Sequence, residues 1–181
     1  MFKPMLKALL LMGTVLLTSL SSPMVMGKGV FQSGPDFVAE VFEQQGNAKV
    51  LWLTNDIRQQ AKLILGRPVT GLRIRYHQHG NKTAWILDEI GKEMPITIGV
   101  VVEANKIAQV KILAYRESRG GEVRYSAYTR QYLGAALNDR YKLDQAIDGI
   151  TGATLSVWAV NKVAALALYY HSLTERTQAD Q

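Results

Sequence analysis

The strongest constraint on the fold is the stretch of residues 71–115, in which strand-forming segments follow one another with short connections. Leu72, Ile74 and Tyr76 alternate with basic residues, which is the period of a strand with one face in water. Three further strands, rich in β-branched or aromatic residues, are predicted at residues 83–89, 96–103 and 107–115. Because the connections are short and parallel neighbours need long crossovers, these strands predict an antiparallel meander.

Helical periodicity precedes this predicted sheet. Ser33 and Thr54 have the character of helix caps, and each is followed by apolar residues at helical spacing. The pattern predicts short helices that end near Gly46 and at Gly66. A β-like run at residues 49–53 lies between them.

Helices also dominate the C-terminal third of the chain. Residues 126–133 predict a short helix, and residues 155–173 predict a long one with an apolar stripe. His171 would then lie at the end of the last helix, where the dipole favours a basic side chain. With no internal repeat or linker, the sequence predicts one α+β domain, an antiparallel sheet meander packed with helices.

The N-terminus has the pattern of a secretory signal. Lys3 and Lys7 precede an apolar run at residues 8–17 that is shorter than the roughly 20 residues of a membrane span. We expect cleavage just before Lys28 and export to the periplasm. The alternative is a membrane anchor formed by an uncleaved N-terminal segment.

Composition excludes several kinds of chemistry. The chain has no cysteine, so it has no disulfide, Cys-ligated zinc, iron–sulfur cluster or thiol nucleophile, and a redox role would need an organic cofactor. The formal charge of +6 includes Lys3 and Lys7, and the other basic residues are scattered. This mild, dispersed charge does not predict a nucleic-acid partner.

Two histidines have a spacing that could hold a metal ion. His77 and His79 would share one face of a strand, but no third ligand is apparent. A pair of solvated histidines is the simpler interpretation, and no metal site or catalytic residue is predicted.

Residues 148–156 form a glycine-containing loop before the longest predicted helix. Gly149 and Gly152 permit close backbone approach, and the helix N-terminus can bind a phosphate. Thr151, Thr154 and Ser156 place hydroxyl groups around that point. Spacing alone leaves a plain helix cap as an alternative.

The same stretch resembles the covalent flavin-attachment motif D-x-x-(S/T)-G-A-T-x-(S/T) of the FMN-binding domain family. That family includes flavinylated periplasmic subunits of the sodium-translocating quinone reductase. Its defined positions are met here by Asp148, Thr151, Gly152, Ala153, Thr154 and Ser156. The resemblance implies that a flavin transferase takes FMN from FAD and joins its phosphate to Thr154 through a phosphoester.

The resemblance extends upstream over residues 95–172. Glu117 and Gly120 keep the family pattern H-x-E-T-P-G, whereas its His, Thr and Pro are replaced by Tyr115, Ser118 and Arg119. The implied cofactor-binding residues are Asp148, Thr151, Gly152, Ala153, Leu155, Ser156, Glu117 and Ser118. It stays open whether the nearby Arg116, Arg119 and Arg124 face the phosphate, a partner or water.

Trp158 lies one helical turn after Thr154 and could approach the isoalloxazine ring of the flavin. Ordinary aromatic burial favours a core position instead.

The resemblance divides the chain into four segments. They are a signal peptide at residues 1–27, helices and first strands of the same globular unit at 28–94, an FMN-binding core at 95–173 and a polar tail at 174–181. The implied function is an exported flavoprotein that relays electrons between a membrane-bound redox partner and a periplasmic acceptor, rather than a stand-alone enzyme. The alternatives are a non-catalytic flavin- or phosphate-binding module, such as a sensor or carrier, and a structural protein.

Overall fold

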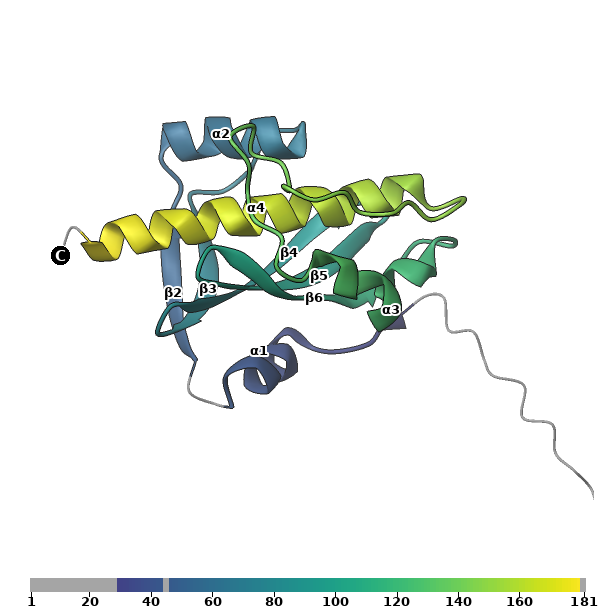
Figure 1. Cartoon of the computed structure of the whole chain (residues 1–181), viewed down its shortest axis with the longest axis horizontal. Coiled ribbons are helices and arrows are strands. Elements are labelled where there is room, and N and C mark those ends of the chain that lie inside the picture. The colour runs from purple at the N-terminus through teal and green to yellow at the C-terminus, as the bar shows by residue number, and fades with distance from the viewer. Residues whose placement is uncertain (1–28, 44–45, 180–181) are drawn as a thin grey trace, which may run out of the picture.

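In the computed structural model, which describes residues 29–43 and 46–179, one antiparallel sheet organises the fold (Figure 1). Its six strands lie in the order β1-β6-β5-β4-β3-β2. They are β1 (Gly29–Val30), β2 (Asn47–Trp52), β3 (Arg73–His79), β4 (Lys82–Ile90), β5 (Pro95–Glu103) and β6 (Lys106–Tyr115). The predicted meander and the α+β class are confirmed. The predicted signal peptide at residues 1–27 lies outside the described residues.

The first two helices begin at the predicted caps. The Ser33 hydroxyl accepts from the Asp36 backbone N–H (3.2 Å) at the start of α1 (Gly34–Phe42). The Thr54 hydroxyl accepts from the Ile57 N–H (3.3 Å) at the start of α2 (Asn55–Leu65). Side-chain oxygens therefore satisfy amide groups that an isolated helix end leaves unpaired.

The segment after β6 is less regular than predicted. The expected helix at residues 126–133 is wrong in its extent: α3 covers only Ser126–Thr129. It lies between the 3-10 turns η1 (Gly121–Arg124) and η2 (Arg130–Tyr132). Tyr132 is fully buried and donates to Asn161 Oδ1 (2.6 Å), so tertiary contacts set the path here.

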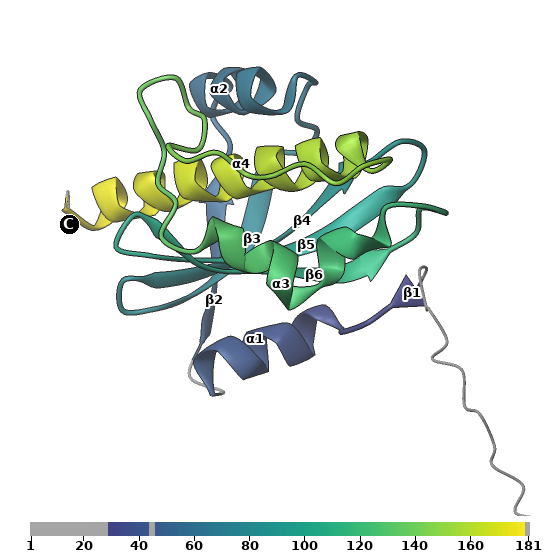
Figure 2. The same ribbon diagram turned by 45° about the vertical axis from the view of Figure 1, so that its right-hand side comes forward.

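The helices cover both faces of the sheet. Figures 1 and 2 show α4 (Thr154–Ala179) across one face with α2 beyond it, and α1 on the opposite face. The main core lies between α4 and the sheet and includes the fully buried Trp85 and Val160. On the other face, Phe37 of α1 packs on Gly99, where a Cβ atom would come within 2.6 Å of the ring. No helix among the described residues combines the length and hydropathy needed to cross a membrane.

Helix α4 differs from its prediction at the C-terminal end. It continues to Ala179, so residues 174–179 are helical rather than a polar tail, and Thr174 is buried. His171 is therefore not at a helix end. It is 1% exposed, and its Nδ1 lies 2.8 Å from the Thr83 hydroxyl, which also accepts from the Trp85 indole N–H.

This burial makes the stability of the protein depend on pH. Burial lowers the pKa of His171, although Glu175, whose Oε1 lies 3.3 Å from Nε2, acts to raise it. The unfolded chain therefore binds a proton near the ordinary value of 6.5, while the folded chain stays neutral to lower pH. We expect the free energy of unfolding to fall below about pH 6.5, by at most about 1.4 kcal/mol per pH unit, until the folded histidine also protonates.

The measurement is urea unfolding of wild type and His171→Gln at several values between about pH 7 and pH 5. His171→Gln should flatten the pH dependence. His77→Gln is the comparison variant. Burial and the charge of Arg75 also lower the pKa of His77, but this side chain is less buried than that of His171. An unchanged slope in His171→Gln would show that the buried imidazole is not its source.

Candidate functional site

The loop at residues 148–156 turns directly into α4. Gly152 has φ +79°, a left-handed conformation that favours glycine, and the Ala153 N–H donates to the Ile150 carbonyl (2.9 Å). The Ala153 carbonyl accepts the first helical bond, from the Val157 N–H (3.0 Å), so Thr154 is the first helical residue. The loop thus presents the Thr154 side chain, which is exposed, at the helix N-terminus.

The Thr154 hydroxyl does not act as a helix cap. Ala153 occupies the N-cap position, and alanine has no side-chain oxygen to satisfy the amides of the first turn. Within the described part of the chain, no hydrogen bond to the Thr154 side chain is present. The plain-cap interpretation therefore does not describe this residue, whose hydroxyl is exposed.

The surroundings of Thr154 fit a phosphate group. The first amides of an α-helix have no partner within the helix, and they form the positive end of its dipole. Cβ atoms placed at Gly149 or Gly152 would meet no atom within 4 Å, so space is open beside the loop. The unpaired amides can donate to phosphate oxygens, the exposed hydroxyl can carry the ester bond, and the open space leaves room for the group.

The upstream segment that resembles the family packs against this loop. Tyr115 is fully buried, and its hydroxyl lies 2.9 Å from the Ser156 hydroxyl and also donates to the Arg119 carbonyl. Gly120 has φ +83°, and a Cβ atom there would come within 2.7 Å of Ala153 Cβ. The structure thus brings two of the sequence segments predicted for the site into direct contact. Burial raises the pKa of Tyr115, which keeps its hydroxyl protonated.

Glu117 has a defined structural partner. It is 6% exposed, and its Oε1 accepts from the backbone N–H groups of Lys92, Glu93 and Met94 at 2.5, 2.7 and 2.9 Å. Burial acts to raise its pKa, but the three amide bonds outweigh burial and hold the pKa below the usual value. The carboxylate therefore fastens the turn between β4 and β5. A contact of Glu117 with a flavin stays a prediction.

The other predicted residues near this segment differ in their surroundings. Ser118 and Arg119 are exposed. Arg116 donates to the Thr97 hydroxyl (3.0 Å) and the Pro95 carbonyl, and the guanidinium of Arg124 lies 4.9 Å from the Phe31 ring centroid. Of the three arginines Arg116, Arg119 and Arg124, the first and the last therefore already contact other groups of the protein.

Gln131 is a positioning residue that sequence reasoning missed. Its Oε1 accepts from the Asp148 N–H (2.9 Å), and its carbonyl accepts from the Gln145 side chain. These bonds tie η2 to the start of the loop, while the Asp148 side chain stays exposed. The resemblance over residues 95–172 includes Gln131, but it does not indicate this contact.

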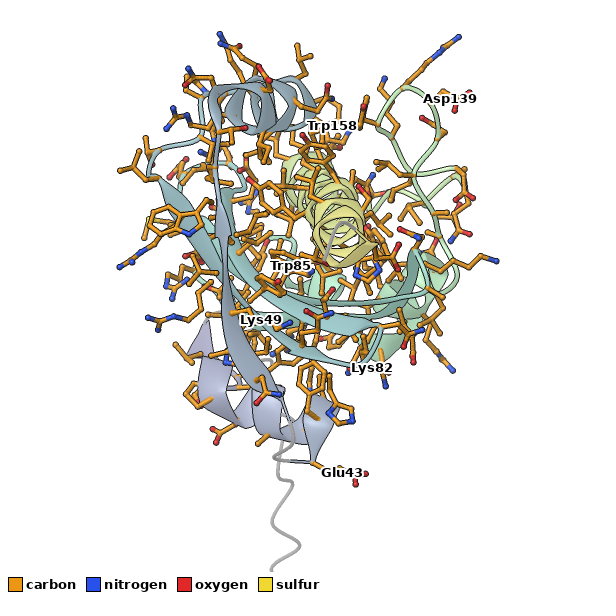
Figure 3. All side chains as sticks on the ribbon, turned by 90° about the vertical axis from the view of Figure 1, so that its left-hand side faces the viewer. Glu43, Lys49, Lys82, Trp85, Asp139 and Trp158 are labelled. Atoms are coloured by element: carbon orange, nitrogen blue, oxygen red, sulfur yellow. The ribbon has the colours of Figure 1, made fainter. Side chains whose placement is uncertain are left out.

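Trp158 is not in the core, so the expectation of burial is wrong. It is 56% exposed, and Figure 3 shows it on the side of α4 that faces away from the sheet, near α2. A cavity of about 500 Å³ lies beside it. Its walls include Ile64 of α2, Tyr141 and Ile147 of the loop before the motif, and Asn161 and Lys162 of α4.

The described residues contain no group of three or more His, Cys, Asp and Glu side chains placed to hold a metal ion. His77 and His79 lie on β3, the first partly buried and the second exposed.

Comparison with protein-family models matches residues 91–169 to the FMN-binding domain. This range includes the loop at residues 148–156 and the upstream segment that contacts it. No curated protein and no solved structure matches the chain.

Proposed function

Because residues 91–169 belong to the FMN-binding domain family, and FMN is therefore the cofactor, we propose that FMN is joined to Thr154 by a phosphoester and that the protein relays electrons. The observation that carries this proposal is the free, exposed hydroxyl of Thr154 at the first residue of α4. It stands within a complete attachment motif, beside open space.

The attachment needs a flavin transferase and FAD. The Thr154 oxygen forms a bond to the phosphorus of the FMN half of FAD, the pyrophosphate bond breaks and AMP leaves. The hydroxyl proton passes to a base of the transferase or to solvent. Asp148 is exposed and available for recognition by the transferase, and the amides at the start of α4 stabilise the charge on the new phosphodiester.

Electron relay is the role that we propose for the bound flavin. Bound flavin accepts and donates one or two electrons. In this proposal the flavin carries the electrons, and the protein contributes placement of the cofactor.

We propose further that the chain acts in the periplasm after removal of residues 1–27. A membrane-bound redox partner would supply or receive the electrons there, and a periplasmic acceptor would complete the relay. A covalent bond suits this compartment because a lost cofactor could not be replaced from the cytoplasm.

The test is expression of the full chain with and without a flavin transferase, followed by mass spectrometry. The expected product begins at Lys28 and carries the mass of FMN less one water on the peptide that contains Thr154. It should be reduced by energised membranes and reoxidised by a soluble acceptor. An unmodified peptide contradicts the attachment, whereas a flavinylated protein that membranes cannot reduce would be a binding module.

A further inference from the structure

The cavity beside Trp158, here called the α4 groove, is lined on α4 from Trp158 onward, four residues after the attachment residue Thr154. It is bounded by Ile64, Tyr141, Ile147, Trp158, Asn161 and Lys162 and holds about 500 Å³. That volume is within the range of about 300 to 1,000 Å³ typical of small-molecule and cofactor sites. The family match does not say where on this chain the flavin ring lies.

We propose that the isoalloxazine ring of the flavin carried by Thr154 lies in the α4 groove and stacks on the indole of Trp158. The inference rests on the proposed attachment. It adds where the ring lies, which side chain contacts its face and which residue changes the reduction potential of the flavin.

Helix geometry places the attachment residue and the groove on one face of α4. Trp158, Asn161 and Lys162 follow Thr154 by one to about two helical turns, at the spacings that share a face. Along the axis, Trp158 lies about 6 Å and Asn161 about 10 Å beyond Thr154. An extended ribityl phosphate spans a comparable distance, so the tether reaches the groove.

The direction of the side chains shortens this path. Helical side chains lean toward the N-terminus of their helix, so the indole of Trp158 lies over the turn that begins at Thr154. The residues on either side of it, Val157 and Ala159, are buried, whereas Trp158 leaves 56% of its surface exposed. A planar ring stacked on the indole would bury apolar surface that the protein otherwise exposes to water.

The polar walls of the groove suit the edge of a flavin. Asn161 Oδ1 accepts from the Tyr132 hydroxyl (2.6 Å), which orients the amide so that its NH₂ group is available to donate. Lys162 adds a positive charge to the same wall. Flavin ring carbonyls are acceptors, and a nearby cation stabilises the anionic reduced ring, so the groove should raise the reduction potential.

Flavin fluorescence tests the stacking in the flavinylated protein, because an indole stacked on the ring quenches its emission. We expect weak emission from the wild type and a several-fold increase in Trp158→Leu. Trp52→Leu is the matched control, since Trp52 is similarly exposed (62%) but lies on β2 at the sheet edge. Emission that is as strong as that of free FMN, or unchanged in Trp158→Leu, would place the ring elsewhere.

A second readout is the reduction potential of the bound flavin. Lys162→Gln should lower it, whereas Lys49→Gln, on the exposed surface of β2, should leave it unchanged. Equal potentials in wild type and Lys162→Gln would contradict the role of this cation. The mass of each sample separates the two proposals. If the protein carries no FMN, both the attachment and the position of the ring are wrong. If the protein carries FMN but Trp158→Leu leaves the emission unchanged, only the position of the ring is wrong.

Discussion

Thr154→Ala should abolish covalent flavin completely, while the free energy of unfolding changes by less than about 0.5 kcal/mol. The hydroxyl that forms the phosphoester is lost, but the side chain is exposed and makes no hydrogen bond within the described residues. Mass spectrometry of protein purified from cells with the transferase measures the loading, and urea unfolding of the unmodified proteins measures the stability.

Two variants at the same position separate the hydroxyl from the shape of the residue. Thr154→Val keeps the branched shape without the hydroxyl and should carry no flavin. Thr154→Ser keeps the hydroxyl and should retain part of the loading. Flavin that persists in Thr154→Ala, on Thr151 or Ser156 for example, would contradict the assignment of the attachment residue.

Gly120→Ala should destabilise the fold by about 2 to 5 kcal/mol and reduce flavin loading. The left-handed backbone at φ +83° costs about 1 to 2 kcal/mol for a residue with a Cβ atom. Overpacking against Ala153 Cβ at 2.7 Å and the Tyr115 hydroxyl at 2.8 Å adds about 1 to 3 kcal/mol. Relief of that overlap must displace Ala153, which precedes the attachment residue.

Gly134→Ala is the matched control for the backbone contribution. Gly134 has a similar φ of +77°, but a Cβ atom there would meet nothing within 4 Å. It should therefore cost only the backbone part and leave flavin loading unchanged. If the two alanine variants were equally stable, the contact between Gly120 and the attachment loop would not be tight.

Local patterns were sufficient for most of the secondary structure. The alternation at residues 72–77, the β-branched and aromatic segments up to residue 115 and the short connections between them predicted the meander. The caps at Ser33 and Thr54 also depend only on neighbouring residues. The short segment at residues 126–132 was predicted less well, because its path depends on the contact of Tyr132 with α4.

Burial on α4 could not be predicted from periodicity. Residues 163–171 are all buried, because α2 and the loop before the motif cover the side of the helix that the sheet does not. Helix periodicity does not say how many neighbours a helix will have. His171 was therefore expected at a helix end but is buried against Thr83, and Trp158 was expected in the core but is exposed.

The sequence by itself determined two points: without cysteine, a redox role would need an organic cofactor, and the motif around Thr154 identified a family that binds FMN. Both are properties of residue type and local order, which need no fold. Only the tertiary structure decided that Gly120 touches Ala153 and that Trp158 borders a groove near Thr154. Such contacts join residues distant in the chain, and packing between elements, rather than local pattern, sets which of them meet.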